Sequence, residues 1–394
     1  MSPQDVIIVG CVPDDPFAID VARYFRQRTE IPDLISLKQF ANSEFCPRFI
    51  WSENDMVHVG TFLEGKTIVI VSTCCGVYDR QSLTTRTMLS ARAAKDNGAD
   101  KVYVVQPDLF YSAQDRGPRP GQGKTRFERD LNDYKKFDGQ PFSARWYAEA
   151  LKTSGVDGVV TVHNHSVSVV HEFRAFFDQE FFNLTPAEIY ADYLPRYHFK
   201  DEDETNIIFC APDEGATVFV SEVKERFDQI TSGRPNMTSQ LLLLKKNRLG
   251  EREVTATLLS ASPTSLEEIQ GRDVAVFDDM VRTGATVVET CEILEEAGAK
   301  SVTLFVTHFN SSDEVKENLN DSCITEVITT NTLPSILNRD QQGRLRKKML
   351  VLKIEKWLAD FLFWHLCQSH LPEGEPLYTI DISSKNPRWA SFAR

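Results

Sequence analysis

The sequence predicts an α/β fold in which parallel strands alternate with helices through two related domains. Apolar runs typical of buried strands alternate with helix-length segments from end to end. A chain of 394 residues is long for a single hydrophobic core, so two domains are expected. A helix that ends in Gly-Ala and leads into an apolar strand occurs twice, at 97–107 and at 297–308, which favours two related halves.

The N-terminal half begins with a strand and then a helix that Asp15 caps and Pro16 opens. The same alternation continues to about residue 165. Strands are predicted at 5–12, 66–72, 101–107 and 157–165, and helices at 16–26, 81–97 and 143–155.

The alternation resumes after Pro186. Strands are predicted at 206–211, 240–246, 253–260, 274–277, 301–309, 324–332 and 377–383, and helices at 217–227, after Thr286 and at 353–366. Two segments interrupt this pattern. Residues 116–140, rich in Gly, Pro and charge, predict a long exposed loop, and 229–237 predict a short turn.

Composition narrows the class of protein. A net charge of −13 without a basic tail argues against a nucleic-acid partner, and no apolar run approaches membrane-spanning length. The N-terminus enters a strand directly and shows no secretory signal. The eight cysteines have no C-x-x-C spacing and are expected to be small buried side chains in a reducing cytosol. We therefore expect a cytoplasmic protein.

Residues 274–289 carry the most informative local pattern. An apolar run leads into Asp278 and Asp279, a small-residue turn follows at 283–286, and a helix begins after it. Ligands of open α/β sheets bind where strand C-termini meet helix N-termini, and small residues there let backbone N–H groups approach a phosphate. Paired carboxylates suit sugar hydroxyls or hydrated Mg²⁺. The pattern predicts a site for a molecule that carries both a phosphate and a diol.

Two polar clusters follow predicted strands of the N-terminal half, at 110–116 and 161–165. In an extended strand, His163 and His165 would lie on one face and suit a metal or a phosphate. The alternative is a pair of hydrogen-bonded residues at the rim of the sheet, which is the better interpretation of the two histidines taken alone.

Two more clusters follow strands of the C-terminal half, at 211–215 and 241–253. Asp213 either holds Mg²⁺ or caps the next helix. The basic run that begins at Lys245 is either a solvated loop or a mobile cationic loop over a triphosphate. The shared position of all these clusters at strand C-termini favours a functional role for them.

Taken in order, these motifs resemble the ribose-phosphate diphosphokinases, or phosphoribosyl pyrophosphate (PRPP) synthetases, over about residues 5–370. The loop at 277–287 resembles a PRPP-binding loop, which ordinary type I phosphoribosyltransferases share. The other motifs in this order are more specific. The segments that carry the resemblance are 39–49, which is similar to an adenine-contacting hairpin, 106–116, 161–166, 211–216, 244–248, 305–309 and 330–334.

The resemblance implies two similar type I phosphoribosyltransferase-like domains, each a mostly parallel sheet flanked by helices. We expect the first at 1–185, joined by a C-terminal helix at about 350–370, and the second, with the PRPP loop, at 186–345. The resemblance also implies a homo-oligomer, built from dimers that assemble into hexamers.

The implied reaction moves the β,γ-diphosphoryl group of ATP to the anomeric hydroxyl of ribose 5-phosphate, with Mg²⁺, and gives PRPP and AMP. Lys246 and Arg248 are the implied catalytic residues, which stabilise charge on the transferring phosphates. The ribose-phosphate site is expected to contain Asp278, Asp279, Arg282, Thr283, Gly284, Ala285 and Thr286. The ATP site is expected to contain Phe40, Asn42, Glu44, Gln114, Asp115 and His165, and the implied metal residues are His165 and Asp213.

The chain departs from the family pattern in the ATP half of the site. Ala113 stands where the family has an arginine that binds ATP phosphate, and His163 replaces an acid. The insertion at 117–140 lies beside the mouth of the expected site, where long loops tune substrates. The candidates to replace the missing cation are Arg116, Arg119, Lys124 and Arg126.

Arg282 replaces the third acid of the PRPP loop, where it would either neutralise Asp278 and Asp279 or bind a further phosphate. Three hypotheses follow: an active PRPP-forming enzyme, a diphosphokinase for a related acceptor with a ribose 5-phosphate end, such as a nucleotide-linked ribose, and a non-catalytic regulatory subunit. The first is favoured because the cationic pair and the acidic residues are retained together. A simple phosphoribosyltransferase is the weakest alternative, since it needs only one such domain.

Overall fold

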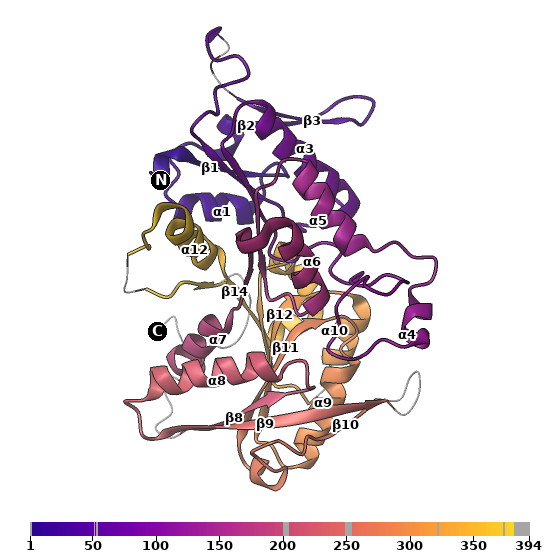
Figure 1. The fold of residues 1–394 in the computed structure, drawn as a ribbon. Helices are drawn as coiled ribbons and strands as arrows, with labels where there is room; N and C mark the ends of the chain where they lie inside the picture. The colour runs from indigo at the N-terminus through magenta and orange to yellow at the C-terminus, as the bar shows by residue number, and fades with distance from the viewer. Residues whose placement is uncertain are drawn as a thin grey trace. The chain divides into compact units, whose positions relative to one another are not determined.

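The computed structural model describes residues 2–50, 52, 54–199, 205–248, 254–320, 323–372 and 375–381, with the backbone alone for 246–248 and 254–256. The chain forms two compact units. The first consists of Met1–Leu184 and Glu355–Glu375, and the second of Thr185–Ile354 and Pro376–Arg394. Figure 1 shows the fold of both units.

Five parallel strands form the sheet of the first unit, in the order β1-β4-β5-β6-β7. Their bounds are β1 (Val6–Gly10), β4 (Thr67–Val71), β5 (Lys101–Val105), β6 (Gly158–Val162) and β7 (Phe181–Leu184). β4 and β6 are buried along their whole length, as expected for parallel strands covered on both faces. The predicted parallel α/β arrangement is confirmed, and β7 is an additional strand that the sequence analysis missed.

The helices of the first unit include the one that closes it from the far end of the chain. They are α1 (Pro16–Tyr24), α2 (Ile31–Leu34), α3 (Arg80–Asp96), α4 (Leu131–Lys136), α5 (Ser143–Thr153), α6 (Val167–Phe177) and α12 (Glu355–Cys367). Asp15 caps α1, as predicted, by accepting the N–H of Phe17 at 3.0 Å. α12 lies beside α1 (Figure 1), with the rings of Phe25 and Phe363 centred 5.2 Å apart.

An antiparallel hairpin extends from the first unit, formed by β2 (Ile35–Gln39) and β3 (Phe45–Phe49). Its anchor is Arg86 of α3, whose guanidinium lies 4.1 Å from the ring centre of Phe45 and 3.8 Å from that of Tyr78. Arg86 is buried, and these ring faces suit a buried cation. The hairpin implied by the family resemblance is present at the expected residues.

Two expectations for the first unit are wrong. The segment 116–140 is not simply an exposed loop, because it contains α4 and buries Asp133. The strand predicted to run to His165 ends at Val162, and His163 has a φ of +46°. The histidines therefore do not share one face of a strand. The chain turns here because the side-chain amide of Asn183 pairs with both backbone groups of Asn164, at 2.8 Å each.

The second unit contains an eight-stranded sheet in the order β10-β9-β8-β11-β12-β13-β14-β15. The pairings β10–β9 and β14–β15 at its two edges are antiparallel and the others are parallel. The strands are β8 (Thr205–Ala211), β9 (Met237–Arg248), β10 (Val254–Leu258), β11 (Asp273–Val281), β12 (Ser301–Phe309), β13 (Glu326–Thr330), β14 (Met349–Lys353) and β15 (Thr379–Ile380).

The two faces of this sheet differ in character. The rings of Phe209, Phe277 and Phe305 stack across β8, β11 and β12, with centres 5.5 and 4.7 Å apart. Aliphatic side chains such as Val276 and Leu304 form a separate cluster with Leu294. The helices are α7 (Ala187–Tyr193), α8 (Thr217–Thr231), α9 (Ala285–Glu296), α10 (Asp313–Asn320) and α11 (Arg339–Gln342). Among the described residues, no helix is long and apolar enough to cross a bilayer.

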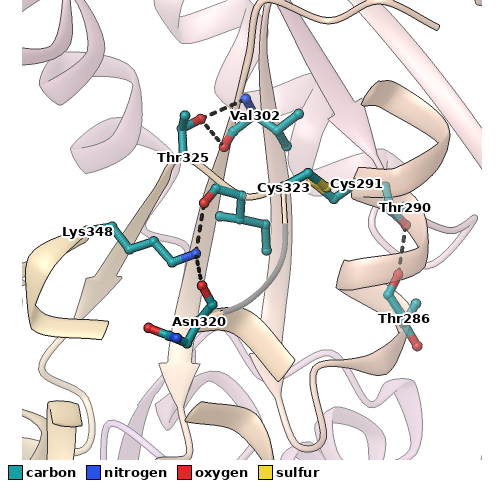
Figure 2. The surroundings of a disulfide bond; sticks show 9 residues. Thr286, Thr290, Cys291, Val302, Asn320, Cys323, Thr325 and Lys348 are labelled. Atoms are coloured by element: carbon teal, nitrogen blue, oxygen red, sulfur yellow. Dashed lines mark hydrogen bonds between the residues drawn. A yellow bond between two sulfur atoms is a disulfide. The ribbon is translucent and has the colours of Figure 1, made fainter. Parts of the chain in front are cut away.

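A disulfide joins Cys291 of α9 to Cys323, which precedes β13, with Cα atoms 6.1 Å apart (Figure 2). The expectation that the cysteines are unpaired is wrong for these two, since the fold brings together residues that lie 32 positions apart. The segment near Cys323 is also fixed by Lys348, whose Nζ donates to the carbonyl oxygens of Asn320 and Ile324 at 3.1 and 3.0 Å. The other described cysteines are free.

The double variant Cys291→Ala/Cys323→Ala is expected to lower the free energy of unfolding by about 2–4 kcal/mol, because the unfolded chain gains conformational freedom. Urea denaturation without reductant measures the change. Cys46→Ala removes an exposed free cysteine and serves as the control, with no expected change. Equal denaturation midpoints for the double variant and the wild type would contradict this prediction.

Candidate active site

Two adjacent carboxyl groups lie near the C-terminal end of β11. Asp278 pairs in register with Val306 of β12, and the strand continues past both acids to Val281. The backbone N–H of Asp279 donates to Oδ1 of Asp278 at 2.9 Å. The pKa of Asp278 is raised well above its ordinary value, first by burial, then by the carboxylate of Asp279 and also by that of Asp213. This concentration of negative charge favours a cation or hydroxyl donors as ligands.

Asp213 lies in the turn between β8 and α8. Its Oδ1 accepts the backbone N–H groups of Gly215 and Ala216, at 2.8 and 3.1 Å. Asp213 thus fixes the turn before α8 but does not cap the helix as one prediction had it, since the N-cap of α8 is Ala216 without a side-chain cap. Since its charge also acts on Asp278, the same carboxylate belongs to the acidic group around β11. Its role as a metal ligand stays a prediction.

The predicted phosphate-binding loop connects β11 to α9. Gly284 is the N-cap of α9 and has a φ of +81°, a left-handed conformation that suits glycine. No side chain caps this 12-residue helix, and a helix N-terminus of this kind suits an anion. Thr283 and Ala285 on either side are exposed, and Thr286 is partly buried. The predicted small-residue turn into a helix is confirmed.

α10 supports this loop from outside it, which the sequence analysis did not foresee. Nδ2 of Asn318 donates to the carbonyl oxygen of Thr283 at 2.8 Å. A Cβ atom added to Gly284 would lie 3.4 Å from Cδ2 of Leu319, so the turn packs directly on this helix. Nothing in the local sequence around Asn318 marks it as a residue of the site, because only the tertiary fold places it there.

Arg282, the basic residue of the loop, is exposed. Its Nε approaches Sδ of Met280 at 3.1 Å. Its guanidinium is therefore open to solvent at the edge of the loop, in a position compatible with binding a phosphate.

The predicted catalytic pair lies on the β9–β10 hairpin. Lys246 is opposite Ala256 and Arg248 is opposite Val254 in the antiparallel register. Their side chains lie outside the described part of the structure, so their roles stay predictions. Residues 249–253, which complete the predicted basic loop, also lie outside the described part of the structure.

A buried polar layer lies at the ends of β12 and β13. Nδ1 of His308 lies 3.0 Å from Oγ1 of Thr332, which in turn donates to the carbonyl oxygen of Thr307 at 2.9 Å. Thr330 donates to the same carbonyl oxygen at 2.7 Å. These residues come from the motifs at 305–309 and 330–334, and their hydrogen bonds hold neighbouring strand ends of the second unit together.

In the first unit, the predicted adenine-contacting residues lie at the tip of the β2–β3 hairpin. The N–H of Phe40 donates to the carbonyl oxygen of Glu44 at 2.8 Å, and Oδ1 of Asn42 accepts the N–H of Glu44 at 3.2 Å. All three residues are exposed, and the exposed fraction of Phe40 is 44%. Ser43 closes the turn with a φ of +71°. An exposed aromatic ring on an ordered turn is suited to stacking on a flat ligand.

Gln114 and Asp115 lie beyond β5. The side-chain Oε1 of Gln114 accepts a hydrogen bond from Ser143 at the start of α5. Asp115 accepts hydrogen bonds from Ser166, at 2.7 Å, and from Arg116, at 3.3 Å. The structure thus brings Asp115 to the N-terminus of α6, directly after His165, which is exposed.

Comparisons with known proteins support the resemblance. A family model for the phosphoribosyl transferase domain matches residues 187–336. The chain is 24% identical to ribose-phosphate pyrophosphokinase 2 of Saccharomyces cerevisiae, over 81% of this chain and 85% of that protein. It is 30% identical to the ribose-phosphate pyrophosphokinase of Corynebacterium efficiens, over 63% of this chain and 64% of that protein. The chain is thus similar to the ribose-phosphate pyrophosphokinases over most of its length, as a divergent relative.

The fold agrees with this assignment. The crystal structure of phosphoribosylpyrophosphate synthetase from Mycobacterium smegmatis superimposes with a TM-score of 0.66 at 21% identity, over 93% of this chain and all of that one. The predicted fold class is therefore confirmed, and the sequence comparisons bear out the predicted resemblance. The individual site residues of this divergent pyrophosphokinase relative remain predictions, which the contacts above make specific enough to test.

Asn318→Ala is expected to weaken binding of ribose 5-phosphate about five- to tenfold, because loss of one hydrogen bond to the loop costs about 1 kcal/mol. Isothermal titration calorimetry with ribose 5-phosphate measures the dissociation constant. Glu317→Ala, an exposed substitution on the same helix, should bind like the wild type. Wild-type affinity in the Asn318 variant would show that α10 does not support the loop.

Asp278→Asn is expected to raise the thermal stability of the metal-free protein at about pH 8, and the gain should vanish near pH 4. A carboxyl whose folded-state pKa is raised contributes stability below its unfolded pKa of about 3.9, and that contribution is lost as the pH rises through the folded value. Thermal denaturation across this range in the presence of EDTA tests the prediction. The exposed substitution Asp340→Asn is the control, and a pH-independent difference between Asp278→Asn and the wild type would refute the assignment.

Proposed function

We propose that this protein is a ribose-phosphate diphosphokinase, which transfers the β,γ-diphosphoryl group of ATP to the anomeric hydroxyl of ribose 5-phosphate and forms PRPP and AMP. The observation that carries the proposal is the succession of Asp278, Asp279 and a glycine-capped helix N-terminus on one β-turn-α segment. This segment joins groups for a diol to groups for a phosphate. The relatives named ribose-phosphate pyrophosphokinases support the reaction class.

In the second unit, the 5-phosphate is proposed to bind the backbone N–H groups of Thr283–Thr286 at the start of α9. The carboxyl groups of Asp278 and Asp279 then accept hydrogen bonds from the ribose hydroxyls. Both contacts fix the sugar in one orientation, and such positioning is a large part of catalysis of phosphoryl transfer. Lys246 and Arg248 are proposed to stabilise the negative charge of the transferring phosphates.

A diphosphokinase that uses ATP generally requires a divalent metal, and we propose Mg²⁺. The chemistry of the residues fits, since Asp213, Asp278 and Asp279 each offer the hard carboxylate oxygens that Mg²⁺ prefers. The pKa of Asp278 is raised first by burial and then by its acidic neighbours, whose charge a cation would balance. Among the described residues, no three His, Cys, Asp or Glu side chains are grouped as a complete metal site. Mg²⁺ commonly takes its remaining ligands from substrate phosphates and water. Bound there, it would neutralise phosphate charge.

For the nucleotide, we propose the hairpin residues Phe40, Asn42 and Glu44 as the adenine contact, and Gln114, Asp115 and His165 as the residues near the phosphates. His165, with Asp213, is also a proposed magnesium ligand. The exposed hairpin tip suits a ligand contact made with another subunit, so we also propose that the protein is a homo-oligomer built from dimers. We further propose that it acts in the cytoplasm.

A related acceptor is the second candidate function. Arg282 is exposed on the ribose-phosphate loop, where its guanidinium can bind a phosphate beyond the one at α9. An acceptor with a ribose 5-phosphate end and an additional phosphate, such as a nucleotide-linked ribose, would use it.

Purified protein incubated with ATP, Mg²⁺ and ribose 5-phosphate is expected to release AMP and PRPP together. Mass spectrometry measures both products. Lys246→Ala should lower kcat by at least about a hundredfold. AMP release with a nucleotide-linked ribose, but none with ribose 5-phosphate, would favour the second function. No AMP with any acceptor of the panel would refute both and leave a non-catalytic subunit as the explanation.

A further inference from the structure

The inserted segment 117–140 encloses a compact group of charges. Nη1 of Arg116 and Nε of Arg129 donate to the two carboxylate oxygens of Asp133, at 2.9 and 2.5 Å. The side chains of Arg129 and Asp133 are only 5% and 7% exposed. Arg129 also donates to the carbonyl oxygens of Gln122 and Gly117, at 2.7 and 2.8 Å. The insertion is thus folded around Asp133.

Aromatic rings complete this group of charges. The guanidinium of Arg129 lies 4.3 Å from the ring centre of Tyr134, and that of Arg116 lies 4.7 Å from that of Phe137. Such rings keep water away from the ion pairs and strengthen them. Removal of the charge of Asp133 would leave the two guanidinium groups without their shared partner, and that loss is costly for buried ion pairs.

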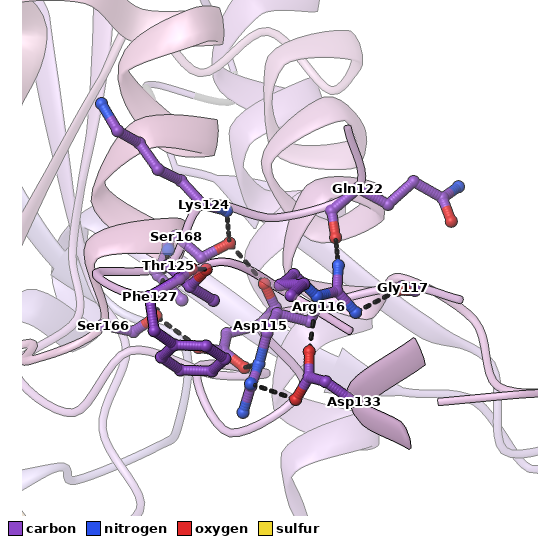
Figure 3. A network of polar contacts seen from close by, with 12 residues as sticks. Asp115, Arg116, Gly117, Gln122, Lys124, Thr125, Phe127, Asp133, Ser166 and Ser168 are labelled. Atoms are coloured by element: carbon purple, nitrogen blue, oxygen red, sulfur yellow. Dashed lines mark hydrogen bonds and ion pairs between the residues drawn. The ribbon is translucent and has the colours of Figure 1, made fainter. Parts of the chain in front are cut away.

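The same group reaches the nucleotide side of the first unit through Asp115 (Figure 3). Nε of Arg116 donates to Oδ1 of Asp115 at 3.3 Å, and Ser166 donates to Oδ2 at 2.7 Å. Ser168 donates to the carbonyl oxygen of Asp115 and accepts the N–H of Lys124, at 3.1 Å for the latter bond. Ser166 is also the N-cap of α6. The insertion is therefore attached to the residues that follow His165.

Gly123 shows how closely the insertion lies against these residues. Its φ is +101°, and an added Cβ would lie 2.9 Å from the carbonyl oxygen of Asp115 and 3.0 Å from Oγ of Ser168. Gly121, two residues earlier, has a similar φ of +78°, but an added Cβ would meet nothing within 4 Å. The close packing against Asp115 and Ser168 is thus found at Gly123 and not at Gly121.

We infer that residues 117–140 form a positioning element for ATP, in which Asp133 holds Arg116, and Arg116 and Gly123 fix Asp115 against the start of α6. The inference deepens the proposed function and rests on it. Asp133 is a positioning residue, because it acts through Arg116 and not on the nucleotide itself. Displacement of Asp115 and of the adjacent Gln114 and His165 would weaken ATP binding and leave the ribose 5-phosphate site of the second unit unaffected.

A matched pair of glycine variants tests the inference in the full chain. Gly123→Ala is expected to raise the KM and the dissociation constant for ATP about tenfold or more, since displacements of about 1 Å can cost a hundredfold. Gly121→Ala carries a similar backbone strain without the close contact, and should retain wild-type values. The KM for ribose 5-phosphate should stay within about twofold in both variants. Equal ATP affinity in the two variants would overturn the inference.

A second pair changes charge and not volume. Asp133→Asn is expected to weaken ATP binding in the same way, whereas Asp138→Asn, which removes an exposed partner of Lys135 in the same insertion, should not. Circular dichroism identifies any variant that fails to fold, in which case the glycine pair decides. A folded Asp133→Asn protein with wild-type ATP affinity would contradict the role of Asp133.

Hydrogen exchange separates this inference from the proposed function. Backbone amides 163–169 should exchange faster in Gly123→Ala than in Gly121→Ala, whether or not the protein forms PRPP. If the wild type makes no AMP but this difference appears together with weaker ATP binding in Gly123→Ala, the proposed reaction fails and the positioning of bound ATP by the insertion stands. If AMP forms and amide exchange and ATP affinity match in both variants, the positioning element fails alone.

Discussion

At Gly284 the backbone takes a φ of +81°, and this conformation lets β11 pass directly into α9 without a side chain over the start of the helix. The proposed ribose-phosphate site depends on that geometry. A residue with a Cβ would be strained in this conformation, although the Cβ itself would make only an ordinary contact with Leu319 of α10, at 3.4 Å. The helix N-terminus attracts a phosphate only while it stays uncovered.

Negative charge is the second physical feature of this site. The carboxyl groups of Asp278 and Asp279 lie on adjacent residues of one strand, and Asp213 adds to their repulsion. Burial first, and then the charges of its acidic neighbours, raise the pKa of Asp278, so its ionised form is unfavourable in the ligand-free protein. The cost is offset when sugar hydroxyls or a cation bind. Binding sites commonly store strain of this kind, and the tightly packed strands β8, β11 and β12 hold it in place.

The charged group around Asp133 in the first unit differs, because its positive and negative side chains pair with one another. The two negative charges of Asp115 and Asp133 balance the two positive charges of Arg116 and Arg129, and all four groups are joined by ion pairs. Arg116 was one candidate to replace the arginine that is absent at Ala113. It is instead ion-paired with Asp115 and Asp133. Arg119, Lys124 and Arg126 are exposed, and the backbone of Lys124 is linked to that of Asp115 through the hydroxyl of Ser168.

Most of the strands and several of the longer helices could be predicted from the sequence, because hydrophobic periodicity and turn residues act locally, but β7 and the helices α6, α7 and α10 were not predicted. The glycine turn before α9 and the Asp15 cap of α1 are local in the same sense. The path of 161–165 and the fold of 116–140 could not, since they depend on Asn183 and on ion pairs between residues that sequence alone does not bring together.

By itself, the sequence determined the α/β class, the family resemblance and the polar residues at the strand ends. The tertiary structure decided that Asn318 supports the phosphate loop, that Cys291 is bonded to Cys323, and that Asp133 is joined to Asp115 through Arg116. The reason is physical. Periodicity reports which face of an element is buried, but contacts between distant residues follow from how whole elements pack.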